Sequence, residues 1–183
     1  MGSLSVMHIH IDRESVAMGD DVESHAEVWN FRDDARLGDV LVRIINQHFL
    51  ASVAGEVAWK VFAQNGSVTD SFDEEKTRRL GYWAGKPAEI AMLFVSESRS
   101  AQVSWTNRMT GARARVADEV IPHGPGEYHF YVDYVSGGRA VPFAEFRDWV
   151  QLSDDEYRAQ IKATRARLYP QFYDENGEPR QRG

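Results

Sequence analysis

The most constraining feature of the sequence is a change in the spacing of its apolar residues near position 32. Residues 6–12 alternate between apolar and polar side chains, and residues 22–31 do so again. Alternation with a period of two is typical of a strand with one buried face. From Leu37 to His48 the apolar residues recur at intervals of three and four instead, which predicts an amphipathic helix. The sequence therefore predicts a β-hairpin followed by one helix.

The hairpin prediction assigns side chains to two faces. A turn centred on Gly19-Asp20 pairs Trp29 with His10. We therefore expect one face to pack beneath the helix through Met7, Ile9, Ile11, Ala26 and Val28, and the other to carry His8, His10, Trp29 and Phe31. Two large aromatic rings on an open sheet are unfavourable in water. We expect the C-terminal part of the chain, or an interface with a partner, to cover them.

The next segments return to strand character. Residues 57–63 are apolar except for Lys60, and Asn65-Gly66 is a strong signal for a two-residue hairpin turn. Ser67–Phe72 is the expected return strand. Residues 88–95 form a nearly continuous apolar run, which is typical of a strand buried in the middle of a sheet.

The order strand, strand, helix, strand, strand, strand resembles the ubiquitin-like β-grasp fold. The resemblance rests on element order in the first half of the chain, and an α+β mixed sheet of another topology is the alternative. β-grasp domains often act as interaction modules, so the resemblance implies protein recognition. The chain continues well past the last of these strands, which argues against conjugation through a Gly-Gly tail. The segments that carry the resemblance are the hairpin 6–31, the helix Leu37–Phe49, the Asn65-Gly66 hairpin and the closing core strand Ile90–Val95.

The second part of the chain is predicted to pack on the first. We divide the chain into a β-grasp-like half (residues 1–98), a strand and helical extension (99–173) and a disordered tail (174–183). The extension has strand-like runs at Ala101–Thr106, Arg113–Val120 and Glu127–Val135. It ends in helices, one through Phe143 and Trp149 and one opened by the capping box from Ser153 to Glu156. The predicted class is α+β.

Composition narrows the classes of function. The chain has no cysteine, which excludes disulfides, thiolate nucleophiles and cysteine-based metal sites. It has no apolar run of membrane-spanning length and no signal peptide, so we expect a cytoplasmic protein without a membrane partner. The formal net charge of −7 disfavours binding to nucleic acid.

Histidines and aromatic residues are the best candidates for a site. His8 and His10 share one strand face, but His25 would lie about 13 Å away along the hairpin, so we expect no metal there. His123 and His129 lie in or beside a Gly-Pro loop, and Tyr82 and Trp83 lie in a second loop. No phosphate-binding, dinucleotide-binding or hydrolase motif is present, and we expect no catalytic residue and no cofactor. The predicted binding residues are His8, His10, Trp29, Phe31, Tyr82 and Trp83.

These observations favour a non-catalytic recognition, adaptor or accessory module. Its partner would be another protein or a second copy of the chain as a homodimer. The alternative is a small-ligand-binding protein or an enzyme that uses His8 and His10, or His123, near Trp29 or Trp83.

Overall fold

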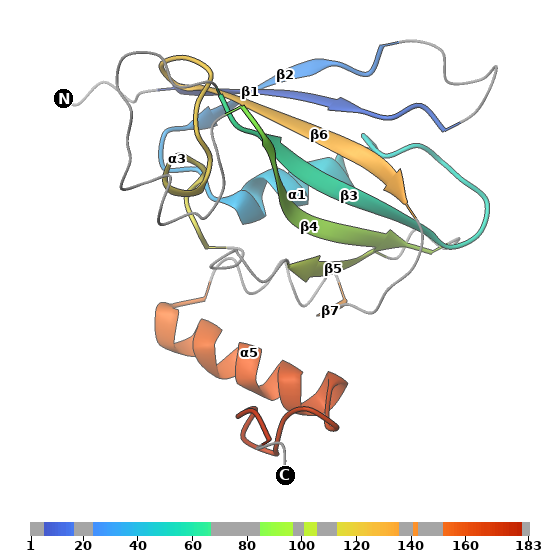
Figure 1. Cartoon of the computed structure of the whole chain (residues 1–183), viewed down its shortest axis with the longest axis vertical. Helices are drawn as coiled ribbons and strands as arrows, with labels where there is room; N and C mark the ends of the chain where they lie inside the picture. The colour runs from blue at the N-terminus through green and yellow to red at the C-terminus, as the bar shows by residue number, and fades with distance from the viewer. Residues whose placement is uncertain are drawn as a thin grey trace.

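The computed structural model describes residues 6–16, 24–66, 85–96, 101–105, 113–135, 141–142 and 152–180. In these ranges the chain is an α+β protein in which one mixed sheet curls around a helix (Figure 1). The predicted α+β class is confirmed. The strands are β1 (Val6–Arg13), β2 (Glu27–Arg32), β3 (Val57–Gln64), β4 (Pro87–Val95), β5 (Ala101–Trp105), β6 (Glu127–Val135) and β7 (Val141–Pro142). The helices are α1 (Leu37–Asn46), α3 (Val116–Glu119) and α5 (Asp154–Leu168).

The strands lie side by side in the order β2-β1-β6-β3-β4-β5-β7, and β7 contributes only two residues at the far edge. β1 and β6 are parallel, and the other neighbouring pairs are antiparallel. β6 comes late in the sequence but lies between β1 and β3. The segments before and after residue 98 therefore share one sheet.

The predicted hairpin of β1 and β2 is present, but its register differs by one residue. Ile9 pairs with Trp29, and His10 pairs with Val28. A shift of one residue moves every side chain of a strand to the opposite face. Trp29 consequently lies in the core at 2% exposure, whereas Val28 is 57% exposed. The prediction that Trp29 and Phe31 share a face with the β1 histidines is wrong.

α1 fills the curl of the sheet, as its apolar spacing predicts. The ring of Trp29 meets Phe49 edge-on with ring centroids 5.3 Å apart, and the Arg43 guanidinium lies 4.7 Å from the Trp29 ring centre. α1 ends at Asn46, and His48 follows with a φ of 55°. A residue in this left-handed conformation commonly terminates a helix. The fully buried residues on the inner stripe of α1 are Leu37, Val40, Leu41 and Ile44.

The strand that completes the centre of the sheet is β6 rather than the predicted Ile90–Val95. Ile90–Val95 belongs to β4, which lies between β3 and β5. The inner face of β6 carries Tyr128, Phe130 and Val132, all buried. Its alternation of buried and half-buried residues fits a strand with the helix on one side only.

The predicted strand Arg113–Val120 is instead the short helix α3. Val116 and Val120 are both fully buried, and a spacing of four residues places them on the same side of a helical turn. Two backbone hydrogen bonds fix this segment at the start of α1: Leu37 N donates to Ala114 O (2.8 Å) and Val116 N donates to Ala35 O (3.0 Å). Tertiary packing therefore outweighs the β propensity of the two valines.

Asn65 and Gly66 connect three segments of the chain. Asn65 is 2% exposed, and its Nδ2 donates to the Lys86 carbonyl (3.1 Å) while its Oδ1 accepts from Ile121 N (3.0 Å). Gly66 leaves no room for a side chain, because a Cβ there would lie 2.1 Å from the Pro122 oxygen. A buried amide with both ends hydrogen-bonded holds the ends of β3 and β4 against the loop before β6.

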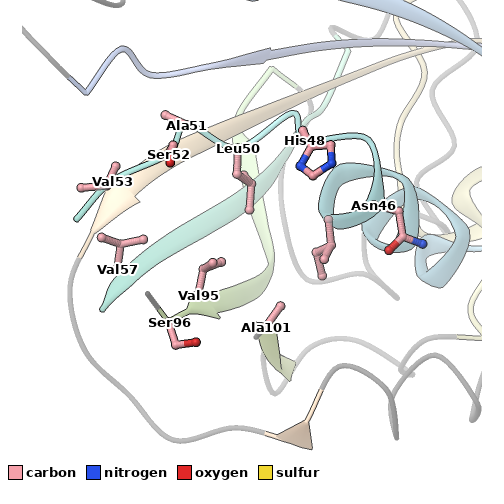
Figure 2. A pocket seen from close by; sticks show the side chains of 11 residues that line it. Asn46, His48, Leu50, Ala51, Ser52, Val53, Val57, Val95, Ser96 and Ala101 are labelled. Carbon is pink, nitrogen blue, oxygen red and sulfur yellow. The ribbon is translucent and has the colours of Figure 1, made fainter. Parts of the chain in front are cut away.

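The short helix α1 leaves one end of the curl only partly filled. A cavity of about 270 Å³ lies there, between the end of α1, the loop that follows it and the ends of β3, β4 and β5 (Figure 2). Figure 2 shows Leu50, Val57 and Val95 around the hollow, with Asn46 and His48 on the α1 side.

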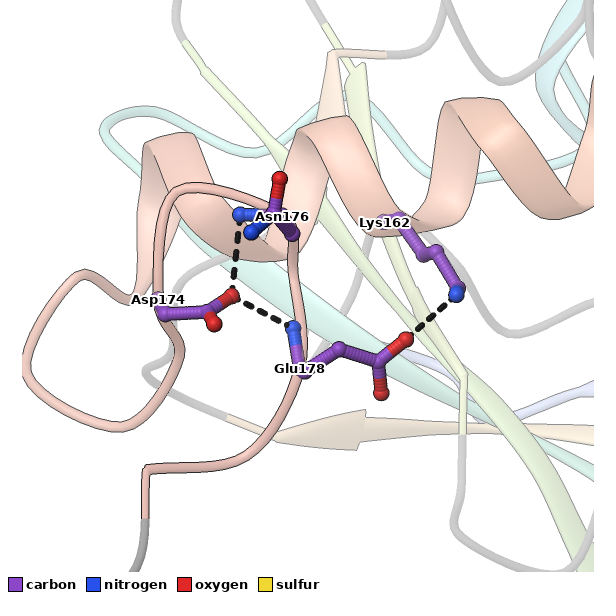
Figure 3. Close-up of polar contacts among 4 residues, drawn as sticks. All are labelled: Lys162, Asp174, Asn176 and Glu178. Carbon is purple, nitrogen blue, oxygen red and sulfur yellow. Dashed lines mark hydrogen bonds and ion pairs between the residues drawn. The ribbon is translucent and has the colours of Figure 1, made fainter.

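α5 begins at the predicted capping box and is followed by a return turn. The Glu156 carboxylate accepts from Ser153 N at 2.8 Å. Residues 174–180, which the sequence places in a disordered tail, form a turn against α5 in the structure. Asp174 Oδ1 accepts the backbone N–H groups of Asn176 (2.9 Å) and Glu178 (3.0 Å), and Lys162 pairs with Glu178 (Figure 3).

Some expectations fall outside the described residues. These are the return strand Ser67–Phe72, the aromatic loop with Tyr82 and Trp83, and the helix through Phe143 and Trp149. Within the described ranges, no helix combines the length and the apolar character needed to cross a membrane.

The stability of the fold should depend on the inner stripe of α1. Ile44 has no exposed surface, so Ile44→Ala removes buried methyl groups and leaves a cavity. We expect the free energy of unfolding in urea to fall by about 2–5 kcal/mol. Val28→Ala, on an exposed site, serves as the control and should change it by less than about 0.5 kcal/mol. Equal effects of the two substitutions would show that Ile44 faces solvent.

Candidate functional site

The face of the sheet that points away from α1, which we call the open face, carries three stacked histidine rings. The parallel register of β1 and β6 sets His10 directly beside His129. Both side chains alternate with buried neighbours, so both project from the open face. Their rings stack with centroids 4.6 Å apart and planes inclined at 23°.

The loop before β6 adds the third ring. His123 N donates to Glu127 O (2.8 Å), and Glu127 N donates to Gly124 O (3.0 Å), so the chain reverses around Gly126, whose φ is 74°. This reversal lays the His123 ring on the other side of His129, with centroids 4.0 Å apart. We call His10, His129 and His123 the histidine row.

Hydrogen-bond acceptors fix the two outer rings of the row, those of His10 and His123. His10 Nε2 donates to Glu127 Oε2 at 2.5 Å, and the two side chains are 39% and 36% exposed. His123 Nε2 lies 2.7 Å from the carbonyl oxygen of Gln64, which can only accept, so this ring nitrogen carries a proton. The outer rings are thereby fixed in position, and the central ring of His129 lies between them.

The environment of His129 favours its neutral form. Burial lowers the pKa of His129 below its ordinary value, and the nearby rings of His123 and His10 lower it further. Glu127 acts in the opposite direction but more weakly. The central ring therefore resists protonation until the solution becomes more acidic than an isolated histidine requires.

Carboxylates lie beside the histidine row on the same face. Burial raises the pKa of the Asp133 carboxyl, and Glu14 raises it further, while Lys60 partly offsets the shift. Burial also raises the pKa of Tyr131, with additional effects from Asp133, Glu14 and Asp12. These like-charge effects indicate a locally negative potential around Tyr131 and Asp133, farther along β6 from the histidine row.

The stacked arrangement does not point the ring nitrogens of the three histidines at a common centre. The lone pairs of an imidazole lie in the plane of its ring, so rings packed face to face do not direct them at a common point. Among the residues that the structure describes, no three histidine or acidic side chains have the geometry to hold a metal. Chemically, the row can present flat imidazole rings to another molecule.

The structure separates the predicted site residues. His8 and His10 lie on the open face, where His8 Nδ1 contacts Asn30 Oδ1 at 2.9 Å. Trp29 and Phe31 lie on the core side, in contact with Arg43. Tyr82 and Trp83 lie outside the described residues.

Sequence reasoning missed that His129 and Glu127 belong with His10. The available signal was the alternation within residues 127–135, which places Glu127, His129 and Tyr131 on one polar side of a strand. The pairing of that strand with β1 could not be predicted, because more than a hundred residues separate the two (His10 and Glu127 are 117 apart).

No known family, protein or structure helps to interpret this site: no family model, no curated protein and no solved structure matches the chain.

The histidine row should make stability depend on pH. The pKa of His129 is lowered in the folded state, so below pH 6.5 the unfolded chain binds a proton that the folded chain resists. The contribution of neutral His129 to the free energy of unfolding is complete above pH 6.5. It is lost as the pH falls toward the pKa of His129 in the folded state. We expect His129→Gln to lose less stability than the wild type between pH 7.5 and 5, measured by urea unfolding.

His8→Gln is the matched control for this prediction, because His8 lies on the same face outside the row. It should keep the pH dependence of the wild type. Identical curves for His129→Gln and the wild type would contradict the account.

Proposed function

We propose that this protein is a non-catalytic recognition module that binds a protein partner through the open face of its sheet. The observation that carries the proposal is the composition of that face. Paired strands present histidine, tyrosine and carboxylate side chains there, at positions fixed by the register of the sheet. A rigid surface of this kind suits recognition, because few side chains need to be ordered when a partner binds.

The charge of the open face favours a basic partner. Asp12 lies opposite Tyr131 on β1, and Asp133 lies two residues farther along β6. Burial raises the pKa of Tyr131, and the negative charges of Asp133, Glu14 and Asp12 raise it further. Potentials of opposite sign accelerate encounter and select partners. A second copy of the chain would present the same negative charge, so we propose a different protein and a monomer in solution.

We also propose that the core is β-grasp-like. The support is the order strand, strand, helix, strand, strand, and the single helix held in the curl of a mixed sheet. β6 then serves as the closing strand, and β5 and α3 form an insertion before it. Domains of this kind often mediate protein contacts, which agrees with the proposed role only at the level of the fold.

An acid–base enzyme is the second candidate, and one contact favours it. His10 and Glu127 form a carboxylate–imidazole pair that remains accessible to solvent. Such a pair can position an imidazole for proton transfer. The two candidates differ in one respect: catalysis would depend on His10 itself, whereas recognition depends on the charge and shape of the whole face.

Charge reversal on the open face should abolish partner binding. We expect the wild type to recover a basic protein from a lysate of the native host, and Asp133→Lys to bind the purified partner at least tenfold more weakly by calorimetry. The wild type should elute from a size-exclusion column with the molar mass of a monomer, measured by light scattering.

Asp155→Lys makes the same charge change on exposed α5 and is the control. It should bind like the wild type. If Asp133→Lys retains the full affinity while its melting temperature is unchanged, the open face is not the docking surface.

A further inference from the structure

The cavity at the end of α1 is a second candidate site, on the opposite side of the sheet from the histidine row. Its floor comes from Leu50, Val57 and Ala101, which are all buried. Its rim includes Asn46 and His48, and both are exposed. An apolar floor below a polar rim is a common arrangement of a small-molecule site.

The size of the cavity limits the ligand. An apolar protein cavity of about 150 Å³ can hold a single benzene ring. The present cavity, of about 270 Å³, is nearly twice as large, which corresponds to two fused rings. It lies close to the lower end of pockets that hold small ligands, about 300 Å³.

His48 gives the rim a specific polar group. Its φ of 55° lies in the left-handed region, where glycine is the usual residue after a helix. His48 therefore has a less favourable backbone conformation than glycine would have there. Its imidazole lies beside the hollow (Figure 2). An imidazole there can accept a hydrogen bond from a ligand.

The C-terminal end of α1 also determines which ligand charge the cavity favours. The carbonyl end of a helix carries partial negative charge, which disfavours an anion nearby. The cavity lies at this end, since Ile45 and Asn46 are the last two residues of α1. A carboxylate head group is therefore disfavoured relative to a neutral hydroxyl or N–H donor.

We propose that this cavity binds a neutral, mostly apolar molecule of two fused rings whose single hydrogen-bond donor contacts His48. The proposal does not depend on the open face or on a protein partner, so each can fail without the other.

The test uses 2-naphthol as the probe at pH 8, titrated into the full chain and followed by NMR shifts of backbone amides. We expect saturable shifts at Leu50, Ala51 and Val57, with a Kd on the order of 0.1 mM. 2-Naphthoate should bind at least tenfold more weakly. The absence of saturable shifts below 2 mM, or equal binding of the naphthoate, would overturn the proposal.

Two variants test the location. Val53→Trp fills the hollow and should abolish the shifts, whereas Val28→Trp on the open face should leave them unchanged. Ala51→Leu is a milder filling variant that should weaken binding if Val53→Trp does not fold. Unchanged affinity in a folded filling variant would place the probe elsewhere.

His48→Gly tests the polar contact without endangering the fold, because glycine adopts the left-handed conformation readily. We expect this variant to bind 2-naphthol about five- to tenfold more weakly and to bind naphthalene as the wild type does. Unchanged affinity for 2-naphthol would overturn the role of His48.

Discussion

The pairing of Ile9 with Trp29 is the constraint on which the rest of the structure depends. It places the largest side chain of β2 against α1 and the segment after it, where Trp29 meets Arg43 and Phe49. The same register necessarily sends His8, His10 and Asp12 to the opposite face, because side chains of a strand alternate. The buried core and the open face are therefore two consequences of one pairing.

β6 connects the core to the candidate site. Its inward residues, including Phe130, complete the core, while Glu127 and His129 meet His10 on the open face. The histidine row thus rests on backbone that core packing holds in place. A site built on paired strands keeps its geometry better than one built on loops. Of the three rings in the row, only His123 comes from a loop, and its contact with Gln64 ties that loop to β3.

Local patterns predicted what depends on local spacing. The change of period gave the hairpin and α1, and the capping box marked the start of α5 at Ser153. The register of β1 and β2 was missed, because polar and apolar residues on β2 alternate in a way that allows either face, so only the packing of Trp29 decides. The meeting of His10 with His129 depends on long-range parallel pairing, which no local pattern reports. The sequence predicts a turn at Asn65. In the structure, its buried side-chain amide forms hydrogen bonds to Lys86 and Ile121, which are distant in the sequence.

The most direct test of the account is disulfide trapping of the β1–β2 register. The chain has no cysteine, so two introduced cysteines can pair only with each other within one molecule. Because His10 lies opposite Val28, the variant with His10→Cys and Val28→Cys should form an intramolecular disulfide under mild oxidation, seen as the loss of two hydrogens by mass spectrometry. A variant with His10→Cys and Glu27→Cys should remain reduced, since Glu27 projects from the other face. Rapid oxidation of the second variant and not of the first would show a different register and would contradict the account.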